Sequence, residues 1–232
     1  MTWVVVPAAG RGARFGGDVP KQYLDLLGKP VIEHTLRALL AHPSVSGAMV
    51  ALSANDARWP GWRDLDGKPV LTCMGGGERA DSVLAALRAL PATVADDAWV
   101  LVHDAARPCV KALDLSRLFA ALKADPVGAL LAAPVRDTLK RAGDDGRVAA
   151  TVPRGSMWRA LTPQAFRRDS LVRALESAER AGVLATDEAM AMERLGLQPL
   201  LVEGSEDNLK ITTPADLAVA ESILRRMGDG RA

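Results

Sequence analysis

The 232-residue sequence predicts an α/β fold: a Rossmann-like, doubly wound and mostly parallel sheet with a protruding β-arm. Three observations predict this class. Short runs rich in β-branched residues alternate with longer amphipathic runs, an order typical of parallel strands joined by crossover helices. Glycine-rich or charged loops follow several of the short runs. The alternation then stops at Pro134, where a segment rich in charge and glycine begins.

The bulk properties limit the alternatives. A chain of this length can bury one substantial core, so we expect a single domain over residues 1–232, with the arm as a subdomain at about 134–157. The net charge of +1 indicates no general attraction to nucleic acid or to a membrane surface. Neither a signal-peptide pattern nor a disulfide framework is present, since Cys73 and Cys109 stand alone, so we expect a cytoplasmic protein.

The first half of the chain supplies three strands and two helices. Four apolar residues at 3–6 predict a buried strand, and residues 30–40 carry an apolar stripe at helical spacing. Residues 49–52 and 70–73 predict two further strands. The glycines at 75–77 then open a helix with Val83, Leu84, Leu87 and Leu90 on one face.

The second half repeats the alternation around the arm. A strand at 99–102, a helix at 115–122 and a strand at 129–133 precede the arm, in which Asp145-Gly146 predicts a hairpin turn. Helices are expected at 163–182 and 187–195, followed by a strand at 200–202. A last helix covers 214–227, with Thr213 as N-cap, Pro214 in the first turn and Asp216 close to the helix start.

The loop after the first strand predicts a phosphate site. Gly10 and Gly12 let backbone N–H groups approach an anion, while Arg14 and Lys21 add two fixed positive charges. The loop is not a dinucleotide fingerprint, because Phe15 stands at the third glycine position, and it is not a P-loop, because no Gly-Lys-Ser/Thr run follows. The loop therefore binds a triphosphate by another plan, and its cations suggest chemistry on that group.

Three more polar clusters follow predicted strands, at 75–82, 103–108 and 208–210. Ligands bind beyond the carboxyl ends of the strands in such sheets, so the clusters should share one edge. Each cluster has a structural and a functional interpretation. The glycines form either a simple turn or a ligand loop, and Asp104 either caps a backbone group or holds Mg²⁺. Arg107 either forms a surface ion pair or binds a ligand. The run Thr186-Asp187-Glu188 is explained by a helix N-cap with first-turn carboxylates.

Taken together, these motifs resemble a known family. They are Pro7-Ala8-Ala9-Gly10-x-Gly12-x-Arg14, Pro20-Lys21-Gln22-Tyr23, Gly76-x-x-Arg79-x-x-Ser82-Val83, Asp104-Ala105-Ala106-Arg107-Pro108, Asp137-Thr138-Leu139-Lys140, Thr162-Pro163-Gln164, Thr186-Asp187-Glu188 and Asn208-Leu209-Lys210-Ile211-Thr212. In this order they resemble 2-C-methyl-D-erythritol 4-phosphate cytidylyltransferases of the non-mevalonate isoprenoid pathway, whose fold is of the nucleotidyltransferase type. The resemblance covers essentially the whole chain. The segment 53–66, Gly77 and Phe15 depart from the family pattern.

The resemblance implies a reaction of CTP with methylerythritol phosphate that yields the CDP-alcohol and pyrophosphate, with Mg²⁺ as cofactor. Arg14 and Lys21 correspond to the transition-state stabilisers, and Asp104 to the position at the metal. The implied nucleotide contacts are Ala8, Ala9, Gly10, Gly12, Gly76, Arg79, Ser82, Asp104 and Ala105. The implied contacts to the polyol phosphate are Asp104, Arg107, Thr138, Arg154, Thr162, Thr186 and Lys210. In the family the arm reaches into a second subunit, so a homodimer is expected, with Thr138 and Arg154 acting across it.

These residue types suit the reaction. Nucleophile, electrophile and leaving group are all anionic, so cations rather than a covalent intermediate lower the barrier. A phosphomonoester is mostly deprotonated at neutral pH, so no general base is required. Three alternatives remain: a cytidylyltransferase for another polyol such as ribitol 5-phosphate, a nucleotide-binding regulator without activity, and a nicotinamide dehydrogenase. Two fixed cations disfavour the regulator, and Phe15 disfavours the dehydrogenase.

Overall fold

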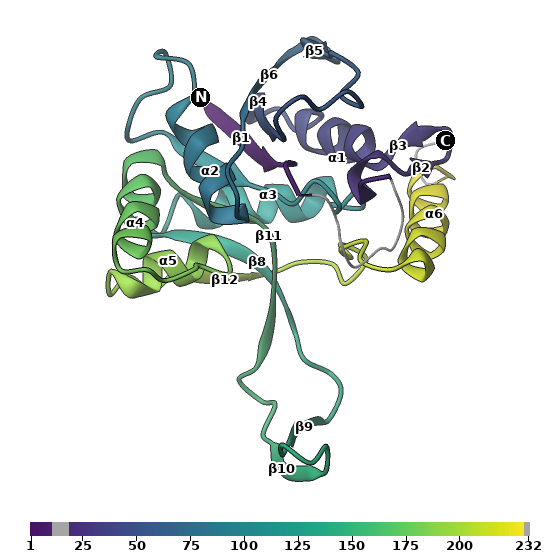
Figure 1. Ribbon diagram of the computed structural model, residues 1–232, viewed down its shortest axis with the longest axis vertical. Coiled ribbons are helices and arrows are strands. Elements are labelled where there is room, and N and C mark those ends of the chain that lie inside the picture. The colour runs from purple at the N-terminus through teal and green to yellow at the C-terminus, as the bar shows by residue number, and fades with distance from the viewer. Residues whose placement is uncertain (11–18, 230–232) are drawn as a thin grey trace.

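The structure is a computed structural model that describes residues 1–10 and 19–229 (Figure 1). Over these residues the chain forms an eight-stranded sheet with helices on both faces and one long projection. Across the sheet the strands lie in the order β12 (Leu200–Glu203), β8 (Gly128–Pro134), β11 (Trp158–Arg167), β7 (Trp99–Val102), β1 (Thr2–Pro7), β4 (Val45–Leu52), β6 (Lys68–Met74) and β5 (Asp64–Leu65). The helices are α1 (Val31–Leu40), α2 (Arg79–Arg88), α3 (Ala112–Ala121), α4 (Arg168–Arg180), α5 (Glu188–Arg194), α6 (Pro214–Asp229) and the 3₁₀ turn η2 (Lys21–Tyr23).

The predicted fold class is confirmed. The strand pairs β12–β8, β7–β1, β1–β4 and β4–β6 are parallel, whereas β11 and β5 run antiparallel to their neighbours. Strand β1 lies between β4 and β7, and the chain reaches these two neighbours through crossovers on opposite faces, by way of α1 and α2. The carboxyl ends of β1 and β7 therefore diverge, which is where doubly wound sheets bind their ligands.

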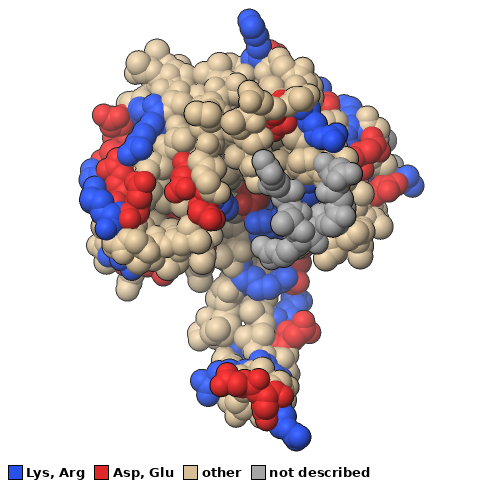
Figure 2. All heavy atoms as spheres, viewed as in Figure 1, with Lys and Arg blue, Asp and Glu red and all other residues tan. Residues whose placement is uncertain are grey.

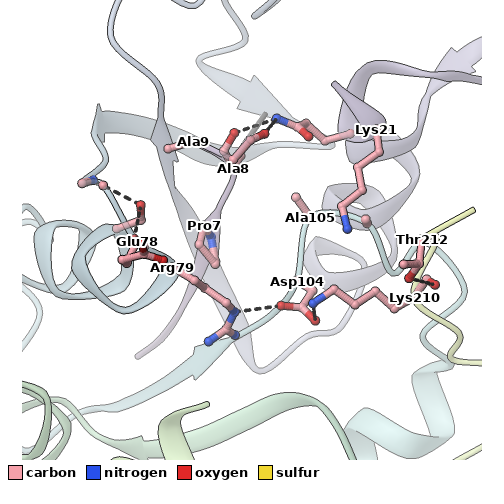
Figure 3. Close-up of a pocket in the computed structure, with 16 residues that line it drawn as sticks. Pro7, Ala8, Ala9, Lys21, Glu78, Arg79, Asp104, Ala105, Lys210 and Thr212 are labelled. Carbon is pink, nitrogen blue, oxygen red and sulfur yellow. Dashed lines mark hydrogen bonds and ion pairs between the residues drawn. The ribbon is translucent and has the colours of Figure 1, made fainter. Parts of the chain in front are cut away.

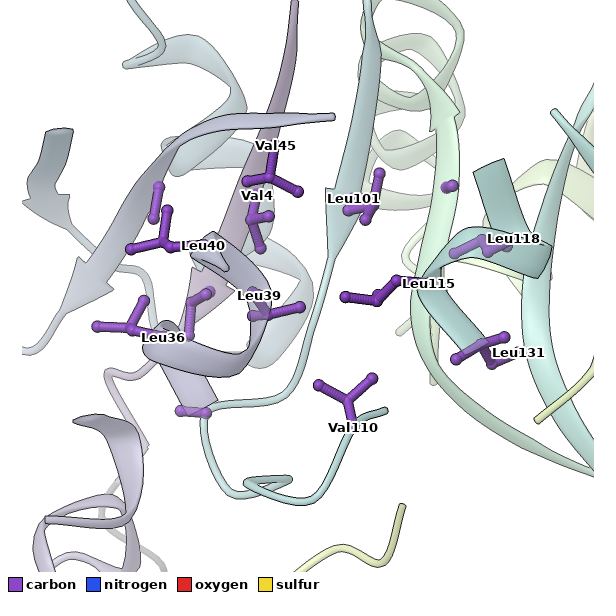
Figure 4. Close-up of a cluster of buried hydrophobic side chains, with 14 of the residues drawn as sticks. Val4, Leu36, Leu39, Leu40, Val45, Leu101, Val110, Leu115, Leu118 and Leu131 are labelled. Atoms are coloured by element: carbon purple, nitrogen blue, oxygen red, sulfur yellow. The ribbon is translucent and has the colours of Figure 1, made fainter. Parts of the chain in front are cut away.

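Alternation along the strands builds two cores. In β1, Val4 and Val6 face α1 and α3, while Trp3 and Val5 face α2, α4 and α5. Figure 4 shows the first of these layers, in which leucines of α1 and α3 pack on strand residues such as Leu101. Fully burying one such side chain stabilises the fold by about 1.5–3 kcal/mol. A third, smaller cluster attaches α6 beside the hairpin of β2 (Asp25–Leu26) and β3 (Lys29–Pro30).

The helix expected at 163–182 was wrong in its first five residues. Residues 158–167 form β11, which lies between β7 and β8, and α4 begins only at Arg168. The register of β11 against β8 shifts between Ala160 and Gln164. Pro163 falls inside this interruption, where its missing N–H removes no ladder hydrogen bond. Polar Thr162 and Gln164 hid the strand in the sequence because both are buried and bonded to side chains instead of water.

Smaller differences concern the ends of elements. Strands β4 and β6 are longer than expected, α3 begins at Ala112 rather than 115, and α2 begins at Arg79 after a capping box of Glu78 and Asp81. Sequence patterns did not indicate the hairpins β2 (Asp25–Leu26)–β3 (Lys29–Pro30) and β5–β6. Both turn through a residue and a glycine with positive φ, and an aspartate carboxylate accepts the glycine N–H.

The arm leaves the sheet where β8 ends and returns at the start of β11 (Figure 1). Its outer part is the antiparallel pair β9 (Leu139–Ala142) and β10 (Val148–Val152), joined by the expected turn with Gly146 at φ +75°. Charged residues of both signs cover the visible face of its tip (Figure 2). None of the helices within residues 1–10 and 19–229 has the length and apolar composition that a bilayer crossing requires.

Candidate active site

A cavity of about 390 Å³ lies at the carboxyl edge of the sheet, where β1, β6 and β7 end. Loops far apart in the sequence surround it (Figure 3). Its lining residues are Pro7, Ala8, Ala9, Gly10, Lys21, Gln22, Gly76, Gly77, Glu78, Arg79, Ser82, Asp104, Ala105, Ala106, Lys210 and Thr212. The four clusters that the sequence placed at one edge therefore do meet. Arg14 and Gly12, the remaining residues expected in the first loop, lie outside the described residues.

The first wall continues strand β1. The Ala8 N–H donates to the Ala51 carbonyl at 2.8 Å, which extends the parallel ladder one step beyond Pro7. The buried amide of Gln22 then donates to the carbonyls of Ala8 at 2.8 Å and Gly10 at 3.1 Å. Two hydrogen bonds from one side chain fix the backbone where the predicted phosphate loop begins. Gln22 was not predicted as a site residue, although it follows Lys21 in a motif.

Lys21 enters the cavity from the 3₁₀ turn η2. The Tyr23 N–H donates to the Pro20 carbonyl at 2.8 Å, and this bond closes the turn that carries the lysine. Figure 3 shows its ammonium group extended toward the loop with Ala105, on the side of the cavity where Asp104 and Lys210 lie. A positive charge therefore faces the space that the four loops enclose, as the sequence predicts.

The glycine loop after β6 forms the opposite wall. A Cβ added to Gly76 would lie 2.3 Å from that of Asp81, so only glycine fits there. The Gly76 N–H donates to the Ser82 hydroxyl at 3.1 Å, and that hydroxyl donates to the Glu78 carbonyl at the same distance. The loop is therefore more than a simple turn: its glycines pack closely against the start of α2 and line the cavity.

Asp104 is the electrostatic centre of the site. Its Oδ1 accepts from Arg79 Nε at 3.0 Å, and its Oδ2 accepts from Arg107 Nε at 3.1 Å and from Lys210 Nζ at 3.0 Å. Burial by itself raises the pKa of Asp104, but Arg79, Lys210 and Arg107 together hold the pKa well below its usual range. The carboxylate is therefore ionised at any pH near neutrality.

Arg79 joins Asp104 to a second buried carboxylate. Its two terminal nitrogens donate to Glu188 at 2.6 and 3.1 Å, in a bidentate pair between α2 and α5. Glu188 is completely buried, and burial raises its pKa while Arg79 opposes the rise. The helix-cap explanation of residues 186–188 was therefore incomplete: Asp187 accepts the Met190 N–H as the N-cap, whereas Glu188 turns toward the site.

Beneath the cavity, His103 and Thr162 form a buried relay. The Asp104 N–H donates to the Thr162 hydroxyl at 3.1 Å, which donates to His103 Nδ1 at 3.0 Å. His103 Nε2 donates to the Arg107 carbonyl at 3.0 Å, which assigns the tautomer with the proton on Nε2. Burial lowers the pKa of His103 to about 4, so the ring is neutral and cannot serve as a solvent-facing base.

The loop after β12 brings Lys210 to Asp104. The buried Asn208 amide donates to the Thr162 carbonyl at 2.7 Å, and Arg107 donates to the Asn208 carbonyl at 2.7 Å. The Ile211 N–H donates to the Ala106 carbonyl at 2.9 Å. These bonds tie the loop to β11 and to the loop after β7, so the position of Lys210 depends on two elements besides its own loop.

Other predicted site residues lie away from the cavity. Thr162 and Arg107 are buried beneath it and bond to its walls. Thr186 is exposed, and its hydroxyl contacts the sulfur of Met190. Thr138 and Arg154 are exposed on the arm, which projects away from the body of the same chain (Figure 1). Of the lining residues, Pro7, Gln22, Gly77, Glu78, Ala106 and Thr212 were not predicted.

The side chains around Asp104 do not build a complete cage for a divalent cation. Three cationic groups already occupy both carboxylate oxygens, which leaves about one lone-pair position. No group of three or more His, Cys, Asp or Glu side chains is placed to bind a metal within the described part of the chain. The arrangement fits a metal that arrives with phosphate oxygens as its main ligands, as Mg²⁺ commonly does.

Comparisons with known proteins identify the family of this chain. The family model described as 2-C-methyl-D-erythritol 4-phosphate cytidylyltransferase matches residues 2–226. A protein of that name from Stenotrophomonas maltophilia (strain R551-3) is 66% identical over 224 residues, covering 97% of both chains. Another from Xanthomonas oryzae pv. oryzae (strain PXO99A) is 62% identical and covers 97% of this chain and 83% of the relative.

Solved structures show the same similarity. The Francisella tularensis 2-C-methyl-D-erythritol 4-phosphate cytidylyltransferase superposes with a TM-score of 0.82 at 34% identity, over 96% of this chain and 99% of that one. The corresponding structure from Thermus thermophilus has a TM-score of 0.77 at 33% identity, over 96% and 98%. By sequence and by fold, this chain therefore belongs to the family of 2-C-methyl-D-erythritol 4-phosphate cytidylyltransferases, which are nucleotidyltransferases.

Proposed function

We propose that this chain transfers CMP from CTP to 2-C-methyl-D-erythritol 4-phosphate and releases pyrophosphate, and that the cavity described above is the active site. The observation that carries the proposal is the meeting of Lys21, Asp104 and Lys210 with two glycine-bearing loops around one cavity. Family membership over residues 2–226 supports this reaction over transfer to another polyol phosphate.

The chemistry needs positive charge more than it needs a base. An oxygen of the polyol phosphate attacks the α-phosphorus of CTP, the new P–O bond forms, and the bond to pyrophosphate breaks in line. Lys21 and Arg14 neutralise the negative charge that accumulates on the transferred and leaving groups. The attacking phosphate is already mostly deprotonated near pH 7, so its oxygen is a nucleophile without proton transfer.

The remaining residues bind and orient the two substrates. Ala8, Ala9 and Gly10 offer backbone groups to the triphosphate, and the small residues at Gly76 and Ser82 leave room for the nucleoside. Lys210 places the phosphate of the polyol, with Arg107 and Thr162 beneath it. Asp104 stays ionised, and its one remaining lone-pair position is available to a substrate hydroxyl or to the cation.

Mg²⁺ enters this proposal with CTP. The cation would take most of its ligands from the triphosphate and at most one oxygen from Asp104, and it would supply charge neutralisation at the leaving group. This assignment rests on the free lone-pair position of Asp104 and on the absence, within the described residues, of any group of three or more His, Cys, Asp or Glu side chains placed to bind a metal.

The arm supports a homodimer. Thr138 and Arg154 are exposed on the arm, which projects from the body of its own chain, and this position suits contact with a substrate bound to another subunit. We propose that the arm of each subunit completes the site of its partner. A cytoplasmic location suits the two free cysteines, Cys73 and Cys109, which a reducing compartment preserves.

Pyrophosphate release with CTP and Mg²⁺ tests the function directly. With 2-C-methyl-D-erythritol 4-phosphate as acceptor we expect steady turnover, and with ribitol 5-phosphate at the same concentration a much smaller kcat/KM. A larger kcat/KM with ribitol 5-phosphate would contradict the proposed acceptor. Omission of both acceptors controls for hydrolysis of CTP.

A further inference from the structure

Glu188 is a buried carboxylate whose side-chain oxygens accept hydrogen bonds from Arg79. It occupies the first position of α5 with 0% exposure. The helix does not need it as a cap, because Asp187 accepts the Met190 N–H at 2.9 Å. A completely buried carboxylate that ends on one arginine points to a positioning task.

The Arg79 guanidinium donates hydrogen bonds to carboxylates on both of the sides with which it could bind a phosphate. Its end-on pair of donors goes to Glu188 at 2.6 and 3.1 Å, and Nε of its side-on pair goes to Asp104 at 3.0 Å. Neither pair is left whole for the bidentate grip with which arginine binds phosphate. Figure 3 shows Arg79 at the cavity wall with Nε directed at Asp104.

We propose that Glu188 is a positioning residue that commits Arg79 to Asp104 and thereby keeps this guanidinium off the phosphate chain of the nucleotide and of pyrophosphate. The inference rests on the proposed function and assigns a role within the same site. In this proposal Arg79 orients Asp104, whereas Lys21, Arg14 and Lys210 are the cations that bind phosphate groups.

The support of Glu188 is itself rigid. The buried Gln164 side chain on β11 donates to Asp187 Oδ2 at 3.0 Å and accepts the Ala189 N–H at 2.8 Å. Gln164 therefore holds both neighbours of Glu188, Asp187 and Ala189, by hydrogen bonds to β11. The chain of contacts runs from β11 through α5 and Arg79 to Asp104, with hydrogen bonds at each step.

The inference predicts a separation between binding and turnover. If Arg79 serves Asp104 only, its removal should leave CTP binding intact while Asp104 loses its orientation. If Arg79 binds the triphosphate, its removal should weaken CTP binding directly. Loss of the Glu188 charge should also free the end-on pair of Arg79 donors for a phosphate group, and pyrophosphate should then inhibit more strongly.

The decisive variant is the double replacement Arg79→Met with Glu188→Met, because exchanging a whole buried ion pair for apolar residues leaves no unpaired charge and commonly preserves folding. We expect kcat to fall about tenfold or more, with KM for CTP within about two-fold of the wild type. A rise of about tenfold in KM for CTP would overturn the inference. The matched control is Arg88→Met with Glu176→Met, another α2 arginine paired with a glutamate at 2.8 Å but exposed, which should leave both constants unchanged.

A second measurement uses Glu188→Gln alone, checked for native circular dichroism. We expect the inhibition constant of pyrophosphate to fall several-fold, whereas the double variant shows no such fall. A constant that stays the same or rises in a folded Glu188→Gln enzyme would contradict the proposed role; if this variant does not fold, the double variant decides. Absence of CMP transfer in the wild type would instead remove the proposed function, so the two failures are distinguishable.

Discussion

At the scale of single residues, the electrostatics of the site depend on which charged side chains are buried away from water. Asp104 would be an ordinary loop carboxylate if it were exposed, yet here it is buried under Arg79, Arg107 and Lys210. The three cations arrive from α2, from the loop after β7 and from the loop after β12. Because their charges oppose the effect of burial on the pKa, Asp104 remains a carboxylate that can accept hydrogen bonds throughout the reaction.

Replacing Lys21 tests the main electrostatic claim. In Lys21→Ala we expect kcat to fall about 10²–10³-fold, because one preorganised donor to the developing charge is worth that factor. Arg14→Ala should have an effect of the same order. Unchanged turnover in both variants would refute their assignment. Lys29→Ala is the control, since this exposed lysine pairs with Glu33 at 3.3 Å and should be kinetically silent.

His103 provides a pH-dependent prediction. Burial lowers its pKa to about 4 in the folded protein, against about 6.5 when unfolded. The unfolded chain therefore binds the proton first, so this contribution to stability is complete above pH 6.5 and is lost as the pH falls toward 4. The total is about 3 kcal/mol, at 1.36 kcal/mol for each pKa unit.

The measurement is an NMR titration of the imidazole resonances. The chain has three histidines, and the signal that vanishes in His103→Gln identifies the buried ring. We expect that signal to stay close to its neutral position from pH 8 down to about pH 5. A midpoint near 6.5 would show that the ring meets solvent and that the relay with Thr162 is absent.

At the scale of elements, β11 links the arm, the core and the site. Its first residues continue the arm, its centre contributes Thr162 to the relay beneath Asp104, and Gln164 holds the start of α5. A single strand thus couples the position of the arm to that of Asp104 and Arg79. The antiparallel direction of β11 follows from this connection, because β8 runs out into the arm and β11 returns from it beside β8.

Mixed dimers test whether the arm acts on the partner. Lys21→Ala lowers kcat and Arg154→Ala mainly raises KM for the polyol phosphate, so at a low concentration of that substrate each should be nearly inactive as a homodimer. After unfolding and refolding together, mixed dimers should contain one intact site, formed by the body of one subunit and the arm of the other. With random pairing we expect about one quarter of the wild-type rate. No recovery on mixing would show that Arg154 acts within its own chain.

At the scale of the whole molecule, the body and the arm have different sources of stability. The body has a layer of apolar side chains on each face of its sheet, whereas β9 and β10 form a separate two-stranded sheet. A two-stranded hairpin is marginal in water by itself. The arm is therefore expected to gain order in the dimer, while the body folds from its own packing.

Replacing the arm separates these two parts. Pro134 pairs with Trp158 across β8 and β11, so a two-residue Asn-Gly turn can join them in place of residues 135–157. We expect this variant to fold, to bind CTP and to sediment as a monomer, with CMP transfer reduced at least about a hundredfold. A dimer of the shortened chain would place the main interface elsewhere on the body.

Patterns readable along the chain were enough to predict the fold class, the hairpin of the arm and most of the cavity lining. These features depend on local signals: apolar periodicity, turn residues, and glycine and charge directly after strands, which a parallel sheet must gather at one edge. Gly76, Ser82, Asp104 and Lys210 were found in this way. Predicting that these residues line the cavity did not require knowledge of their hydrogen-bond partners.

The strand β11 and the roles of Gln22, Glu188 and His103 became visible only in the folded chain. Each of these features involves a polar group that is buried beside a partner distant in the chain: Glu188 lies 109 residues from Arg79, and Thr162 lies 59 from His103. Local patterns mark such groups as solvent-facing or as helix caps. Their meaning changes only when the assembled sheet removes water and supplies the partner, because the free energy of a buried polar group depends on what it bonds to.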